Sequence, residues 1–109
     1  MLTTALIAAV SVLSTPAANG YSQPSVSAVA SETGADVHGS ICRLRADALA
    51  PPSMVVIRRT DASGHVEAST AAVLNGGGLR GRGLGCAYYT AHTEWRLDDG
   101  ERIVVAPAN

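Results

Sequence analysis

The chain has 109 residues, of which 47% are hydrophobic and 16% charged, and its formal net charge is −1. This length suits a single domain. The nearly balanced charge gives no basis for binding nucleic acid or an anionic membrane surface. Two cysteines are too few for a disulfide-rich miniprotein or a four-thiolate zinc site, and no motif identifies a substrate.

The first segment has the layout of a secretory signal peptide. An apolar run at residues 5–13 is followed by Pro16 and by small residues, among them Ala17 and Ala18, in the order of an apolar region and a cleavage site. As a helix, residues 2–13 would rise only about 18 Å, which is too short for a bilayer core of about 30 Å. We therefore expect a signal peptide at residues 1–18, cleavage near Ala17 or Ala18, no membrane span in the mature chain, and a secreted or periplasmic protein.

One feature of this segment leaves an alternative open. The four residues before the apolar run contain no Lys or Arg, whereas a signal peptide usually begins with a positive segment. The alternative is a core helix in a protein that is not exported.

Residues 19–34 are rich in Ala, Ser, Gly and Pro and show no sustained hydrophobic period. Such a segment has little apolar surface to offset the entropy of ordering, so we predict a flexible lead-in. The folded domain is then expected to span residues 35–109.

The rest of the sequence predicts short strands rather than helices. Alternating or β-branched patterns occupy residues 37–43, 54–59, 65–74, 86–97 and 102–106. The predicted fold is all-β, a small antiparallel β-sandwich or open barrel of about 5–6 short strands. Residues 43–50 are either two turns of helix or a short loop.

Turn residues predict two hairpins. Asp61 and Gly64 lie in a short connection that pairs residues 54–59 with the strand that follows. Asp98-Asp99-Gly100 predicts that residues 102–106 return along the strand that contains Trp95, and Pro107 is expected to end the returning strand.

Export would favour a disulfide between Cys42 and Cys86. If these two residues lie opposite each other in an antiparallel pair, Asp36 lies across from His92, and His38 across from Thr90. That register predicts a cluster of polar side chains on one face of the sheet.

The glycine-rich stretch at residues 76–85 matches G-x-G-x-x-G, but the glycines that follow prevent the helix that a dinucleotide site requires. We interpret the stretch as a connection between strands, with Arg80 and Arg82 forming a modest anion-attracting tip.

The leading hypothesis is an exported, disulfide-bonded β domain without catalytic activity, which binds an unknown protein or glycan in the cell envelope or outside the cell. Its candidate binding residues are Arg80, Arg82, Tyr88 and Tyr89, and no cofactor or nucleic acid is expected. One alternative is a metal-handling or small hydrolytic protein that uses His38, His92 and Glu94. Another is a purely structural surface protein.

Overall fold

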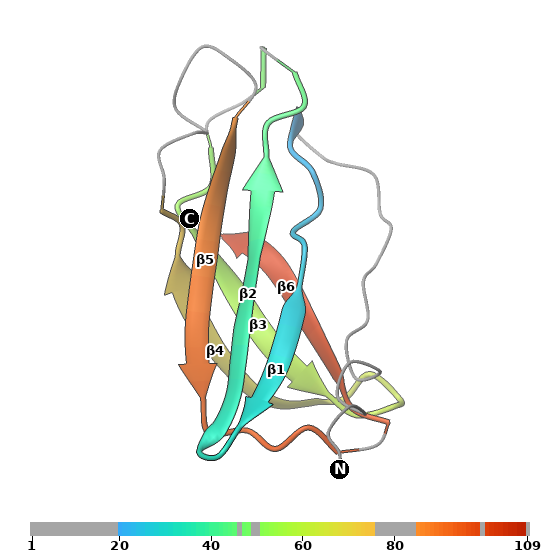
Figure 1. The fold of residues 1–109 in the computed structure, drawn as a ribbon. Coiled ribbons are helices and arrows are strands. Elements are labelled where there is room, and N and C mark those ends of the chain that lie inside the picture. Colours follow the sequence, from blue (N-terminus) through green and yellow to red (C-terminus); the bar gives the residue numbers. More distant parts are fainter. Residues whose placement is uncertain (1–19, 46, 49–50, 76–84, 99, 109) are drawn as a thin grey trace.

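The computed structural model describes residues 20–45, 47–48, 51–75, 85–98 and 100–108. Its six strands are β1 (Ser27–Ser31), β2 (Gly34–Cys42), β3 (Met54–Thr60), β4 (Val66–Val73), β5 (Cys86–Thr93) and β6 (Arg102–Ala108). They form two antiparallel sheets, in the orders β1-β2-β5 and β4-β3-β6. Figure 1 shows sheet β1-β2-β5, here called the front sheet, in front of the other. The prediction of a small antiparallel all-β domain is confirmed, and the described residues of 43–50 form no helix.

The core lies between the two sheets and is built from every second residue of the strands. The largest fully buried side chains are Val37, Ile41, Val55, Ile57, Tyr89 and Ile103. Trp95 and Leu97 pack against this core from the segment after β5. Because the residues between the buried ones face outward, the front sheet presents a polar outer face.

The predicted hairpin between residues 54–59 and the next strand is present as β3 and β4. The Oδ1 atom of Asp61 accepts hydrogen bonds from the backbone N–H groups of Ser63 and His65, both at 2.9 Å, and from the Ser63 hydroxyl at 2.7 Å. The Ser63 hydroxyl contributes most to holding the pKa of Asp61 below its usual value. Gly64 completes the turn with a φ of 92°, which favours glycine.

The prediction of a flexible lead-in is wrong for residues 20–34. Tyr21 is buried, the Ser22 N–H donates to the Cys42 carbonyl at 2.8 Å, and β1 pairs with β2 along its whole length. The amino-acid composition of residues 19–34 does not predict strand β1 because the apolar side chains of that strand are small. The backbone hydrogen bonds that order the strand come from the edge of β2, which lies later in the sequence.

The predicted second hairpin is also wrong, because β6 pairs with β3 in the other sheet. The turn itself forms: the Glu101 N–H donates to the Asp98 carbonyl at 3.1 Å, and Gly100 has a φ of 86°. However, β5 ends at Thr93, so the chain has already left the front sheet before it reaches the turn. Pro107 does not end β6, which continues to Ala108 as an edge strand, where proline is tolerated.

Candidate functional site

The disulfide between Cys42 and Cys86 is present, with an S–S distance of 2.04 Å. The two residues lie directly opposite each other in β2 and β5, and this register places Asp36 across from His92 and His38 across from Thr90. The prediction of both the bridge and the register is therefore confirmed. The bridge fixes one end of the strand pair whose other end carries His92.

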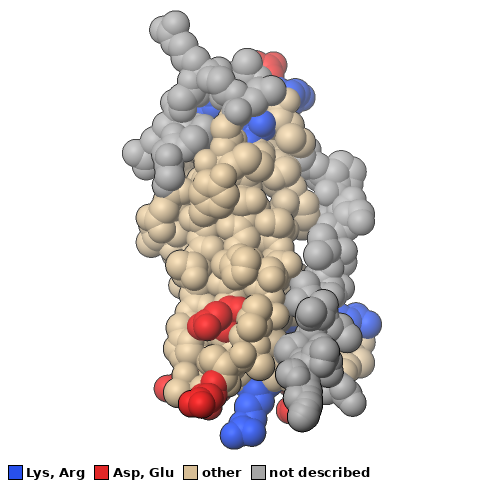
Figure 2. Space-filling view, in the orientation of Figure 1, with Lys and Arg blue, Asp and Glu red and all other residues tan. Residues whose placement is uncertain are grey.

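The outer face of sheet β1-β2-β5 carries mostly polar side chains. It carries Ser27 and Val29 from β1, Asp36, His38 and Ser40 from β2, and Tyr88, Thr90 and His92 from β5. No Arg or Lys occurs in the sequence of these strands. In Figure 2, which views this face, the blue side chains lie toward the two ends of the molecule and none lies across the middle.

Tyr88 and Tyr89, both predicted as binding residues, have opposite environments. The side chain of Tyr88 is 59% exposed on the outer face, whereas Tyr89 is only 2% exposed in the core. The Tyr89 hydroxyl donates to the Ser25 carbonyl at 2.7 Å, and burial raises the pKa of Tyr89 to about 12. Tyr89 is thus a structural residue, and only Tyr88 is available to a partner.

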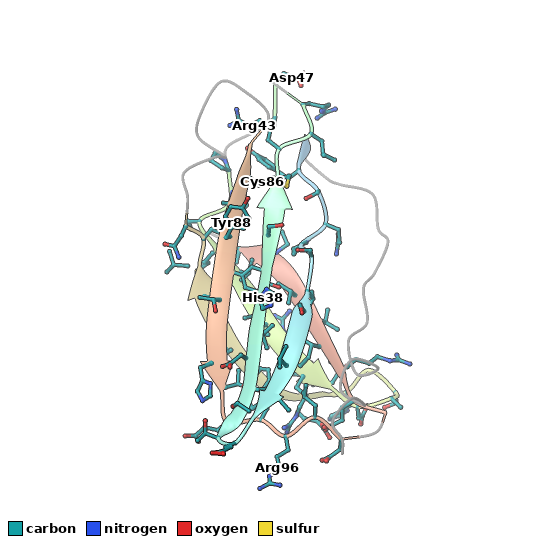
Figure 3. The ribbon with its side chains drawn as sticks, in the orientation of Figure 1. His38, Arg43, Asp47, Cys86, Tyr88 and Arg96 are labelled. Atoms are coloured by element: carbon teal, nitrogen blue, oxygen red, sulfur yellow. A yellow bond between two sulfur atoms is a disulfide. The ribbon has the colours of Figure 1, made fainter. Side chains whose placement is uncertain are left out.

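Two hydrogen bonds to Asn75 fix the backbone of Tyr88 on one side of β5. Its N–H donates to the Asn75 carbonyl at 2.8 Å, and its carbonyl accepts from the Asn75 N–H at 2.7 Å. On the other side it pairs with Ser40 of β2. Figure 3 shows Tyr88 on β5 and His38 on β2, both on the front sheet. The phenol ring therefore projects from a rigid support.

At the other end of this face, three side chains form a hydrogen-bonded chain. The Oδ1 atom of Asp36 lies 2.6 Å from Nδ1 of His92, and Nε2 of His92 lies 3.1 Å from Oγ1 of Thr33. Asp36 and His92 are about half exposed. Sequence reasoning brought Asp36 and His92 together but missed Thr33, because that residue lies within the segment assigned to the flexible lead-in.

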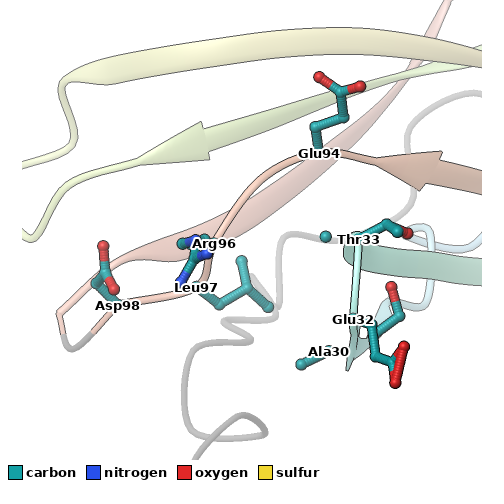
Figure 4. A pocket seen from close by; sticks show the side chains of 9 residues that line it. Ala30, Glu32, Thr33, Glu94, Arg96, Leu97 and Asp98 are labelled. Atoms are coloured by element: carbon teal, nitrogen blue, oxygen red, sulfur yellow. The ribbon is translucent and has the colours of Figure 1, made fainter.

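Next to these three hydrogen-bonded side chains lies a partly open cavity of about 530 Å³. Its walls are residues 30–34, from the end of β1 through the turn to the first residue of β2, and residues 94 and 96–98, from the segment that follows β5. Figure 4 shows Thr33 on one side of the cavity, with Glu94, Arg96 and Asp98 along the segment opposite. The wall carries three carboxylates, from Glu32, Glu94 and Asp98, against one guanidinium, so it favours neutral or cationic molecules.

A second charged group lies on the other sheet and was not predicted. The Nε atom of Arg59 is 3.5 Å from a carboxylate oxygen of Glu67 and 3.5 Å from one of Glu101, and its guanidinium lies 5.9 Å from the centre of the Trp95 ring. A hydrogen bond between the two carboxyl groups raises the pKa of Glu67 and lowers that of Glu101. This group joins β3, β4 and the segment before β6, so we assign it a structural role.

The remaining predicted site residues divide into two sets. Arg80 and Arg82, with the rest of residues 76–84, lie outside the residues that the structure describes, as does the predicted signal peptide. Glu94 lies beyond the end of β5, in the cavity wall, and His38 lies opposite Thr90. Across the described ranges, no three His, Cys, Asp or Glu side chains are placed to hold a metal ion.

In the part of the chain that the structure describes, no helix has the length and apolar character needed to cross a membrane. Comparisons with protein-family models, with curated proteins and with solved structures find no match to this chain. The chemistry of the surface is therefore the basis for a functional proposal.

Proposed function

We propose that this chain is an exported domain that binds an uncharged glycan through the outer face of sheet β1-β2-β5. The observation that carries the proposal is Tyr88, a rigidly held phenol ring that is 59% exposed among short hydrogen-bonding side chains. An aromatic face offers a flat apolar contact for a sugar ring, and its hydroxyl stays in water. Ser, Thr and Tyr side chains form hydrogen bonds at a low cost in conformational entropy.

The composition of this face favours a glycan over a protein. A stable protein interface usually has a central apolar cluster that contributes most of the binding free energy. Here the outer face has one phenol ring and one valine, and its other members are hydroxyl, imidazole and carboxylate groups. The absence of Arg and Lys from the sequence of these strands argues against a sulfated or phosphorylated sugar.

Export is supported by the position of the predicted cleavage site and by the disulfide. Cleavage near Ala17 or Ala18 leaves the buried Tyr21 and strand β1 in the mature chain. A structural disulfide is typical of proteins that fold in an oxidising compartment. These two observations favour the cell envelope or the medium as the place where the protein acts.

The test is a binding assay of the disulfide-bonded full chain against immobilised neutral oligosaccharides, with acidic oligosaccharides as a comparison set. We expect the chain to bind at least one neutral oligosaccharide, and Tyr88→Ala to weaken that binding by about tenfold. Tyr88→Phe should keep most of the affinity because the ring remains.

Val66→Ala is the matched control, because Val66 is also half exposed but lies on the other sheet. It should bind as the wild type does. If no neutral oligosaccharide binds, or if Tyr88→Ala binds as well as Val66→Ala, the proposal is wrong. Capture of a defined envelope protein by the Tyr88 face, without glycan binding, would replace it with a protein-binding function.

A further inference from the structure

The hydrogen bonds that join Thr33, His92 and Asp36 have one direction when the carboxylate is ionised and the imidazole is neutral. An ionised carboxylate can only accept hydrogen bonds, so the short contact with Asp36 makes Nδ1 of His92 the donor. A neutral imidazole then has its lone pair on Nε2, which can only accept. In this neutral form the Thr33 hydroxyl, at 3.1 Å, donates to Nε2. This is the arrangement in which an imidazole can take the proton of a nucleophilic hydroxyl.

The backbone around the three residues holds them in place. Asp36 and His92 are direct partners in the register of β2 and β5. Thr33 lies in the turn between β1 and β2, and the next residue, Gly34, packs so closely on β5 that an added Cβ would lie 1.8 Å from the Thr93 carbonyl oxygen. The buried Thr93 hydroxyl donates to the Ala35 carbonyl at 2.9 Å and thereby ties the same turn to the end of β5.

Thr33 belongs both to the hydrogen-bonded group with His92 and Asp36 and to the wall of the cavity. Thr33 is part of the wall of the 530 Å³ cavity, and its hydroxyl contacts His92, which is not a wall residue and lies with Asp36 on the outer face of the sheet. A small molecule in the cavity would therefore lie next to Thr33. The carboxylates of the wall would disfavour an anionic acyl group.

We infer that Thr33 is an acyl-accepting nucleophile, His92 its general base and Asp36 a positioning residue, acting on small neutral or cationic esters. The Thr33 oxygen forms a bond to the acyl carbon while its proton passes to Nε2 of His92. The bond from the acyl carbon to the alcohol oxygen breaks, and that oxygen takes the proton from His92. Water, deprotonated by His92, then attacks the Thr33 ester and releases the acid. The Thr33 oxygen regains its proton, and the net reaction is ester hydrolysis.

This activity goes beyond glycan binding and does not depend on it. Tyr88 lies four residues before His92 on β5 and takes no part in the proton path. A chain that fails to bind oligosaccharides could still be acylated, and the reverse also holds.

The experiment uses the disulfide-bonded full chain with p-nitrophenyl acetate as the probe. We expect an initial release of p-nitrophenol that approaches one equivalent per chain, and a peptide mass that places the acetyl group on Thr33. Thr33→Val, which keeps the shape but lacks the hydroxyl, should lower the rate by about tenfold or more. Thr33→Ser should retain the reaction, which shows that loss in the valine variant is not a folding defect.

The controls distinguish acyl transfer to Thr33, with His92 and Asp36, from direct ester hydrolysis by an exposed histidine. An exposed imidazole hydrolyses p-nitrophenyl esters by itself, so the control is His65→Gln, which removes an exposed histidine between β3 and β4 and should leave the rate of Thr33 acetylation unchanged. Asp36→Ala should lower the maximal acetylation rate rather than the apparent affinity, and Asp36→Glu should restore part of it. If Thr33→Val reacts as fast as the wild type, or if the acetyl group is found only on other residues, the inference is wrong.

Discussion

Replacement of both Cys42 and Cys86 by alanine is expected to lower the free energy of unfolding by about 4 kcal/mol. The bridge joins residues separated by 44 positions, so it removes many conformations from the unfolded chain. A small domain has a net stability of about 5–15 kcal/mol, so the variant is expected to be marginally folded.

Urea unfolding followed by tryptophan fluorescence measures this effect through Trp95, which packs against the core. The wild type in a reducing buffer should match the double variant. Thr90→Ala, on the outer face of the same strand, should unfold close to the oxidised wild type. An unfolding midpoint for the double variant equal to that of the oxidised wild type would show that the bridge contributes nothing.

Gly34→Ala is expected to lower the free energy of unfolding by about 3 kcal/mol. Gly34 has a φ of 152°, and an added Cβ would lie 1.8 Å from the Thr93 carbonyl oxygen and 2.7 Å from the Cα atom of Glu94. Because both contacts are with backbone, a side chain cannot simply turn away to relieve them. The turn would have to move off β5, which would also separate Thr33 from His92.

Gly64→Ala is the matched control for this substitution. Gly64 also has a positive φ, 92°, but no atom of a neighbouring segment lies within 4 Å of the added Cβ. Its loss should be limited to backbone strain, about 1–2 kcal/mol. Urea unfolding of the two variants compares them directly, and equal losses would contradict the close packing of Gly34 on β5.

The front sheet could be predicted from sequence where local pattern and one long-range constraint agreed. Alternation places Val37 and Ile41 inside and their neighbours outside, and the structure follows it. The assumption that Cys42 and Cys86 lie opposite each other set the register across eight residue pairs. This is why the pairing of Asp36 with His92 could be predicted without any other information.

The rest of the fold depended on contacts that a local pattern does not encode. The sequence around Gly100 predicts a turn correctly, but it cannot say which strand lies beside β6. Tyr88 and Tyr89 are identical in type and adjacent, and only the phase of β5 decides which one is buried. Thr33 had no signal in the sequence, because its partner His92 lies 59 residues away.

Export with a closed Cys42–Cys86 bridge underlies the proposed role of this domain outside the cytoplasm. The most direct test is the intact mass, the N-terminal sequence and the thiol content of the protein recovered from its native host. We predict a chain that begins at Ala18 or Asn19 and has no free thiol. A chain that retains Met1 and has two free thiols would contradict both export and the bridge.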